Sequence, residues 1–366
     1  MARVHNFNAG PAVLPVSVLQ ELQASILEYG DTGIGIMEMS HRSKPFEAIV
    51  HKAVERTRRL LSVPADYSVI FLQGGATLQF HQHALNLLKP GEAADYLVTG
   101  VWAKGALADA KLVGDAMACW DGKGCNYNQL PLDGAYPVRD SAVYVHYTTN
   151  NTIYGTQWPY PPGAGGKPLV ADMSSDIASR PIDVGAHQVI YAGAQKNLGP
   201  SGVTLVILSP WALERVDAVA TARGGLPKML DYRSQVKENS LLNTPNTWGL
   251  FALERVLAWM EGQGGLAAME ARNKAKADLL YAELDRTDFW RPHAVQGCRS
   301  WMNVPWRAPT EALENQLVAE SEAAGFRGLK GHRSVGGIRA SLYNALELSS
   351  VEALVGFLRD FEARNG

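Results

Sequence analysis

Short apolar segments with the length of β-strands alternate with segments of helical spacing from about Ser17 to Met260. This order constrains the fold, because two parallel strands can be joined only by a crossover connection, which is usually a helix. The sequence therefore predicts an α/β domain with a mostly parallel sheet that is covered by helices on both faces.

The last third of the chain has a different order of elements. A helix is predicted over 247–261, and after a glycine turn a longer amphipathic helix runs to about Arg286. The segments that follow predict a strand, a helix, a strand and a helix, over 300–304, 310–324, 338–342 and 349–364. We therefore expect a large domain of residues 16–261 and a smaller C-terminal α+β domain of residues 262–366.

Lys196 follows an apolar run from Val189 to Ala194, and a sharp turn leads from it into a second apolar strand, 203–208. Lysine is among the side chains least often buried. A lysine held at the end of a buried strand loses hydration, which favours the neutral amine that forms Schiff bases with carbonyl groups. A lysine that only caps a strand at the surface would fit this segment equally well.

A second strand, ending at Asp172, favours the catalytic interpretation. Pyridoxal phosphate enzymes need an acid that keeps the pyridine nitrogen protonated and a lysine that carries the cofactor aldehyde. Asp172 and Lys196 lie at the ends of two successive strands and suit these two roles. Asp172 taken alone could also be a structural residue that caps a turn.

A glycine turn over 73–77 separates a predicted strand, 67–72, from a predicted helix. Such a turn presents free backbone N–H groups and the positive end of the helix dipole to an anion. Gly75, Ala76 and Thr77 are therefore candidates for a phosphate site. The signal is weak, since glycine pairs often precede helices, and the spacing matches neither the P-loop nor the dinucleotide fingerprint.

These segments resemble the phosphoserine aminotransferase branch of the class V aminotransferases, which have the fold of the type I pyridoxal phosphate enzymes. The resemblance covers the whole chain and rests on residues 6–11, 37–42, 74–80, 171–175, 180–183, 191–196, 243–245, 330–333 and 336–341. The lysine and aspartate segments are shared loosely by many relatives. Two of the other segments contain His-Arg pairs, which point to a phosphorylated substrate.

The resemblance implies further contacts with pyridoxal 5′-phosphate, one per subunit. It implies that Trp102 stacks on the cofactor ring, that Thr152 contacts the ring oxygen and that Gln195 contacts the phosphate. Asn243 and Thr244 match donors that reach this phosphate from the neighbouring subunit of a homodimer. Ordinary alternatives are a core tryptophan, a loop threonine and the turn chemistry of an Asn-Thr-Pro segment.

The substrate carries two anionic ends, so its binding site should contain cationic side chains. By the same resemblance, Arg339 pairs with the α-carboxylate, because arginine matches planar carboxylates. His41 and Arg42, with His332 and Arg333 from a different subunit, form a clamp for the far-end phosphate. One His-Arg pair would be explained as surface charge, whereas two pairs beside glycine or serine turns favour a site.

The implied reaction is a reversible ping-pong transfer of the amino group from L-glutamate to 3-phosphohydroxypyruvate, giving O-phospho-L-serine and 2-oxoglutarate in serine biosynthesis. Relatives in bacteria also use 3-hydroxy-2-oxo-4-phosphooxybutanoate in pyridoxine biosynthesis. The family places the active site at the dimer interface and joins an N-terminal segment, residues 1–15, to the small domain. Two residues depart from the pattern of some members: Ala9 replaces a serine and Thr77 an arginine.

Composition argues against several other classes of protein. A net charge of −2 with interspersed signs gives no basic surface for nucleic acid. No apolar run has the length of a membrane span, and residues 1–6 lack the apolar core of a signal peptide. Three cysteines are too few for a disulfide framework or a zinc site, so we expect a cytoplasmic protein. His81 and His83 do not share a helix face, and no metal site is predicted.

Three alternatives stay open at this point. A cysteine desulfurase of the same fold would need a mobile nucleophilic cysteine, for which Cys298 is the candidate. A serine–glyoxylate or alanine transaminase would have little use for two His-Arg pairs. A cofactor-binding regulatory module would need a basic DNA-binding domain, for which this chain has no spare length.

Overall fold

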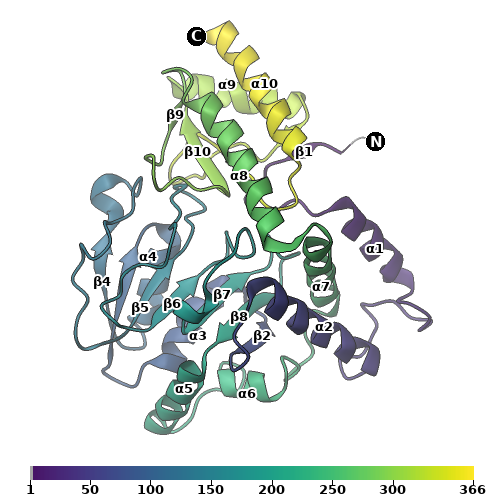
Figure 1. The fold of residues 1–366 in the computed structure, drawn as a ribbon, viewed down its shortest axis with the longest axis vertical. Helices are drawn as coiled ribbons and strands as arrows, with labels where there is room; N and C mark the ends of the chain where they lie inside the picture. The colour runs from purple at the N-terminus through teal and green to yellow at the C-terminus, as the bar shows by residue number, and fades with distance from the viewer. Residues whose placement is uncertain (1–2) are drawn as a thin grey trace.

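Seven strands form one twisted sheet at the centre of the larger part of the molecule (Figure 1). The structure is a computed structural model, and it describes residues 3–366. In spatial order the strands are β2 (Ser68–Leu72), β8 (Thr204–Leu208), β7 (Val189–Gly193), β6 (Leu169–Asp172), β5 (Ala142–Thr148), β3 (Ala93–Val98) and β4 (Asp115–Asp121). Only β8 runs antiparallel to its neighbours in this sheet. The predicted α/β class is therefore confirmed.

Helices cover both faces of this sheet. Alternate strand residues point to opposite faces, so Val69 and Phe71 belong to one hydrophobic core while Ile70 and Leu72 belong to the other. The first core is completed by α1 (Val16–Leu27), α2 (Lys44–Leu61) and α7 (Thr247–Gly262). The second is completed by α3 (Gly75–Leu87), α4 (Val101–Ala110), α5 (Pro210–Arg223) and α6 (Tyr232–Lys237). The central strands are buried on both sides, which explains their continuous apolar sequences.

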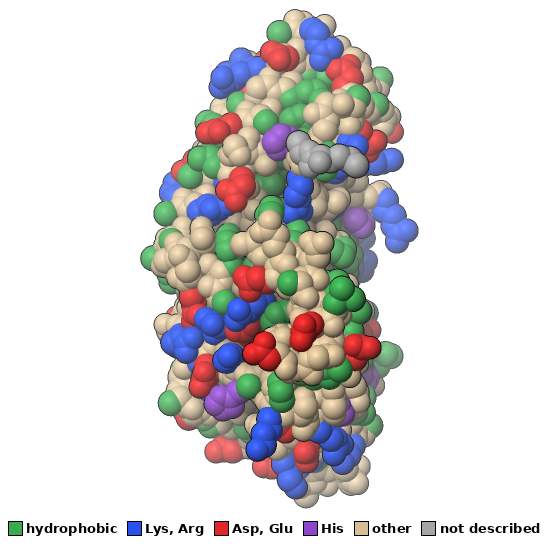
Figure 2. Space-filling view, turned by 90° about the vertical axis from the view of Figure 1, so that its right-hand side faces the viewer, with side chains coloured by type: hydrophobic (Ala, Val, Ile, Leu, Met, Phe, Trp, Pro, Cys, Tyr) green, Lys and Arg blue, Asp and Glu red, His purple; other side chains and the backbone are tan. Residues whose placement is uncertain are grey.

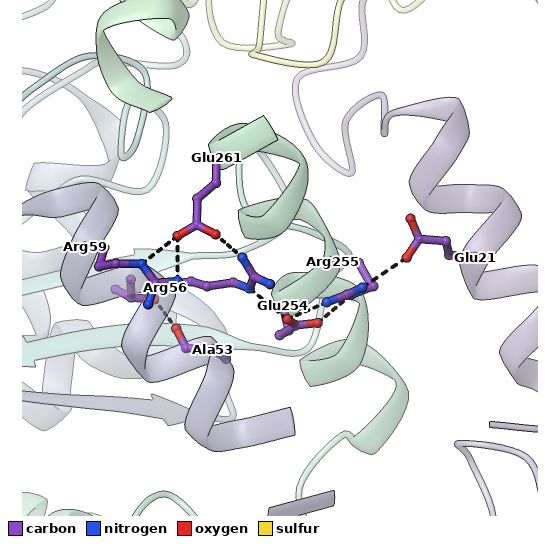
Figure 3. Close-up of polar contacts among 8 residues, drawn as sticks. Glu21, Ala53, Arg56, Arg59, Glu254, Arg255 and Glu261 are labelled. Carbon is purple, nitrogen blue, oxygen red and sulfur yellow. Dashed lines mark hydrogen bonds and ion pairs between the residues drawn. The ribbon is translucent and has the colours of Figure 1, made fainter. Parts of the chain in front are cut away.

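Ion pairs fix α2 against α7 (Figure 3). Glu254 is 2% exposed and accepts from Arg56 Nε at 2.9 Å and from Arg255 Nε at 2.5 Å. Two turns further along α7, Glu261 pairs with Arg56 and, at 2.8 Å, with Arg59. A buried carboxylate that is shared by two guanidinium groups holds the helices in one relative position.

The C-terminal elements form a second, smaller body around a third hydrophobic core. Its sheet has the order β12-β10-β9, with β12 (Ile338–Ser341), β10 (Asn303–Arg307) and β9 (Arg291–Pro292) all antiparallel. The helices α8 (Gly265–Leu284), α9 (Glu311–Ala323) and α10 (Leu348–Asn365) pack with it. The N-terminal strand β1 (His5–Asn6) pairs in parallel with β11 (Phe326–Arg327), and Phe7 is buried in the third core.

The predicted strand over 300–304 begins three residues late, at Asn303. The reason is local: the Ser300 hydroxyl accepts from the backbone N–H groups of Met302 and Asn303, which bends the chain before the strand starts. Helix α8 contributes to two cores, with Leu266 and Met269 in the first and Leu280 and Leu284 in the third. The division of the chain at residues 261 and 262 stays a prediction.

Charges of both signs are interspersed on the face of the molecule that Figure 2 shows. Over residues 3–366, no helix combines the length and the apolar character that crossing a membrane requires. Within the same residues, no group of three or more His, Cys, Asp or Glu side chains is placed to hold a metal ion.

Candidate active site

A cavity of about 290 Å³ lies where the carboxyl ends of β5 and β6, the turn after β7 and the first turn of α3 come together. Ligands of open α/β sheets bind at such strand ends. The cavity brings together ten residues singled out from the sequence: Gly75, Ala76, Thr77, Trp102, Thr152, Asp172, Gln195, Lys196, His332 and Arg339.

Lys196 stands in the turn that follows β7, and its Nζ donates to Thr152 Oγ1 at 2.8 Å. Burial lowers the pKa of this amine to about 8, against the opposing effect of the Asp172 carboxylate. The positive charge of Arg339 lowers the pKa further. A substantial neutral fraction of the amine near pH 8 is what a nucleophilic or proton-accepting lysine requires.

Asp172 ends β6 and is 4% exposed. Burial raises the pKa of its carboxyl group, whereas hydrogen bonds from Ser174 and the charge of Lys196 act in the opposite direction. The bond from Ser174 N to Asp172 Oδ1 is 2.9 Å long and fixes the direction of the carboxylate. A buried carboxylate held in this way attracts a proton or a cationic ring nitrogen.

The first turn of α3 forms the part of the cavity suited to an anion. Gly74 and Gly75 have φ of +90° and +67°, and a Cβ on Gly74 would lie 2.4 Å from Leu78 Cδ2. Only glycine allows the chain to turn so sharply from β2 into the helix. The N–H groups of the first helical turn have no acceptor within a helix and are available to an oxyanion.

Three buried polar atoms of residues that line the cavity have no hydrogen-bond partner among the described residues: Trp102 Nε1, Thr148 Oγ1 and Arg339 Nε. A buried donor without a partner is costly, at about 1–3 kcal/mol. Two unpaired donors, a free hydroxyl and the N–H groups of the α3 turn fit a polar, anionic ligand, and pyridoxal 5′-phosphate is one.

Five predicted residues do not line this cavity. His41 and Arg42 line a separate cavity of about 840 Å³ beside β2, and Arg333 is exposed at the surface. Asn243 and Thr244 lie beside the glycine turn that opens α3, where Gln73 Nε2 is 3.3 Å from Asn243 Oδ1 and 3.4 Å from Thr244 O.

Thr148 and Asn150 line the cavity although the sequence did not single them out. Thr148 pairs in register with Asp172 across β5 and β6, so the two side chains lie on the same face of the sheet. The available signal was the apolar strand that ends at Thr148, because residues that follow neighbouring parallel strands share one sheet edge.

Cys298 is buried and does not line the cavity. Burial raises the pKa of its thiol, and the sulfur is 3.5 Å from Val295 O and 3.8 Å from Asn128 O. A protonated, enclosed thiol is a poor nucleophile, which argues against a desulfurase. Ala9 and Thr77, the two departures from the family pattern, both line the cavity.

Comparison with known proteins gives concordant results. The model of the aminotransferase class V family matches residues 4–354. A phosphoserine aminotransferase of Geobacillus kaustophilus is 50% identical over 365 residues, covering 100% of this chain and 99% of the relative. One from Pseudomonas putida is 47% identical over 364 residues, covering 100% and 99%. The solved phosphoserine aminotransferase of Bacillus circulans subsp. alkalophilus has a TM-score of 0.94 at 47% identity, covering 100% of this chain and 99% of the other.

Proposed function

The chain belongs to the class V aminotransferases, and on that premise we infer that it transfers the amino group of L-glutamate to 3-phosphohydroxypyruvate, giving O-phospho-L-serine and 2-oxoglutarate. The family resemblance drawn from the sequence is thereby confirmed. The observation that supports this function most directly is that Lys196, Asp172 and the first turn of α3 line one cavity. These groups come from separate strands and helices and match the needs of one cofactor.

The residues present fit pyridoxal 5′-phosphate, the cofactor of the family. We assign the phosphate to Gly75–Thr77 and Gln195, the ring nitrogen to Asp172 and the face of the ring to Trp102. When bound, the cofactor supplies an aldehyde that carries the amino group and a ring that withdraws electrons from the substrate Cα.

Lys196 is the group that moves the proton of the substrate Cα. Its amine has a pKa of about 8, so it can accept and return a proton near neutral pH. Thr152 holds Nζ at 2.8 Å and thereby limits its position. Asp172 would supply a negative charge to the ring nitrogen of the cofactor, in a site where little water can screen it.

Arg339 binds the α-carboxylate that the amino and oxo substrates share. Its NH1 donates to Thr152 O at 3.1 Å, while Nε is buried without a partner. Burial lowers the pKa of the guanidinium, but the group stays charged at neutral pH. A fixed, partly desolvated cation with a free donor is suited to a carboxylate.

The phosphate end of the substrate requires a second copy of the chain in this proposal. His41 and Arg42 line a cavity other than the one that holds Lys196. Within one subunit they cannot complete the clamp with His332, which lines the cavity of Lys196. In a homodimer, His41 and Arg42 of each subunit would lie at the active site of the other subunit, and the two His-Arg pairs would come together. Asn243 and Thr244 would reach the partner's cofactor phosphate in the same way.

The substrate is tested with the wild-type enzyme. Glutamate and 3-phosphohydroxypyruvate should support rapid amino transfer, whereas hydroxypyruvate, which lacks the phosphate, should be used poorly. Truncating one partner of a hydrogen-bonded charge pair costs about 2–5 kcal/mol, so we expect at least about a 30-fold difference in kcat/KM. Equal use of hydroxypyruvate or pyruvate would exclude a phosphate clamp and indicate a different transaminase of this fold.

A further inference from the structure

Tyr343 is a buried residue just after β12 that the proposed function leaves without a role. Its side chain is 1% exposed. The hydroxyl donates to Ala9 O at 2.9 Å and accepts from Asn303 Nδ2 at 3.2 Å. Ala9 lines the active-site cavity, and Asn303 belongs to the sheet that carries Arg339. One hydroxyl therefore joins the N-terminal segment to the substrate-binding sheet.

The same network reaches the strand ends of the large sheet. Asn303 Oδ1 accepts from Asn150 Nδ2 at 2.9 Å, and Asn150 Nδ2 also donates to Ser175 Oγ at 2.8 Å. Asn303 Nδ2 donates to Ser341 Oγ at 3.0 Å, which fixes the amide from its other side. Every one of these side chains is at most 2% exposed. Buried and fully bonded amides of this kind specify a single relative position of the elements they join.

The backbone of Tyr343 is also held in place. The fully buried Lys276 donates through Nζ to Leu342 O and Tyr343 O, both at 2.7 Å. The next residue, Asn344, donates its backbone N–H to Asn197 Oδ1 at 3.1 Å, and Asn197 is the neighbour of Lys196. The phenol ring therefore projects from a fixed base toward Ala9.

The segment that this hydroxyl holds lies against the catalytic lysine. Ala12 N donates to Gln195 O at 2.9 Å, and a Cβ on Gly10 would lie 3.3 Å from Lys196 Cγ. Gly10 has φ of +132°, a conformation that favours glycine. Ala9 and Gly10 thus form a wall of the cavity beside the stem of Lys196.

We propose that Tyr343 is a positioning residue for amino transfer, an inference that rests on the proposed function. Its hydroxyl holds the wall of Ala9 and Gly10 at a fixed place beside Lys196, so that the substrate enters a preformed cavity. Without the hydroxyl, the substrate has to order this wall as it binds, and affinity falls. The chemical step changes little, because the hydroxyl bonds to Ala9 and Asn303 and leaves the amine of Lys196 with its own partner, Thr152.

The test is Tyr343→Phe in the holoenzyme, with Tyr136→Phe as a matched control. Tyr136 is 6% exposed and donates to a backbone carbonyl, Gly163 O, at 2.7 Å, but does not line the cavity. In Tyr343→Phe we expect KM for glutamate and for the oxo acid to rise about three- to ten-fold, as for one lost hydrogen bond, with kcat within about two-fold. Each of the two variants loses one buried hydrogen bond, so we expect Tyr136→Phe to lower Tm about as much as Tyr343→Phe does. Unlike Tyr343→Phe, it should leave KM unchanged.

Hydrogen exchange gives a second measurement that does not depend on turnover. The peptide that contains residues 9–12 should exchange faster in Tyr343→Phe than in wild type, and no such change should occur in Tyr136→Phe. Unchanged KM in a folded Tyr343→Phe enzyme, or an equal rise in the control, overturns the proposal. If Tyr343→Phe does not fold, Asn303→Ser removes the other hydrogen bond of this hydroxyl, the one that orients it toward Ala9, and must raise KM as well. A wild type without transaminase activity would refute the proposed function instead.

Discussion

Replacing Arg339 with Ala removes the only guanidinium that lines the cavity among the described residues. The side chain makes one bond within the protein, from NH1 to Thr152 O at 3.1 Å, and its Nε is left without a partner. Loss of a charged partner of a bound carboxylate costs about 2–5 kcal/mol. Arg339 is partly exposed, so water replaces some of the lost interaction, and the lower end, about 2 kcal/mol, is the better estimate.

A loss of about 2 kcal/mol corresponds to about a 30-fold fall in kcat/KM. Every amino and oxo substrate carries the α-carboxylate, so glutamate, 3-phosphohydroxypyruvate and hydroxypyruvate should all lose activity by a similar factor. Steady-state kinetics with each substrate measures this. Arg291→Ala is the control, because Arg291 lies in the same small sheet and donates to a backbone carbonyl, Ala308 O, away from the cavity.

Arg42→Ala and Arg333→Ala test the phosphate end of the substrate, whereas Arg339→Ala tests the α-carboxylate end. These two changes should raise KM for 3-phosphohydroxypyruvate and have little effect on hydroxypyruvate, which has no phosphate to bind. An Arg339→Ala enzyme that loses less than about three-fold on all substrates would refute the carboxylate assignment. A loss of activity confined to the phosphorylated substrate would indicate that Arg339 binds the phosphate and not the α-carboxylate.

Four further predictions concern the cofactor and stability. Lys196→Ala should fold but not turn over, and in wild type borohydride should fix the cofactor to the peptide containing Lys196. A protonated amine does not attack an aldehyde, so the rate at which the apoprotein takes up pyridoxal phosphate should rise with pH and level off above about pH 8. With an ordinary lysine the rate would continue to rise up to about pH 10.4. Asp172→Asn should slow the half-reaction with glutamate by about 10²-fold, and a near-normal rate would mean that another acid holds the ring nitrogen. Glu254→Gln should lower the free energy of unfolding by about 1–3 kcal/mol and Glu261→Gln by less, because Glu254 is the more buried partner of two arginines; equal losses would contradict this.

Much of the site could be predicted because each of its parts carries a local signal. Lys196 and Asp172 each follow a short apolar segment, and the paired glycines before α3 require a sharp turn whatever surrounds them. The parallel order of β5, β6 and β7 then brings the strand ends to one edge. Local pattern and topology together therefore account for the meeting of these residues in the candidate cofactor site.

Contacts between distant residues could not be predicted in this way. The bond from Tyr343 to Ala9 joins residues 334 positions apart, and the bond between Asn150 and Asn303 spans 153 positions. No periodicity in the sequence relates such partners, since their meeting depends on how the small sheet docks on the large one. His41 and Arg42 show the opposite case. They are neighbours in the sequence and are predicted from it to bind substrate, but in a single chain they lie outside the cavity of Lys196.

The polar atoms left without partners indicate what the fold is built to bind. Trp102, Thr148 and Arg339 come from α4, β5 and β12 and line one cavity, and each has a buried polar atom without a partner among the described residues. A buried polar group without a partner costs stability, so three such groups around one cavity favour a ligand that satisfies them. Thr148 belongs to the large sheet, Trp102 to a helix that packs against it, and Arg339 to the small sheet. On the proposal made for Tyr343, the affinity for substrate depends on the relative position of the two sheets, which Asn303 joins through its bonds to Asn150 and Tyr343.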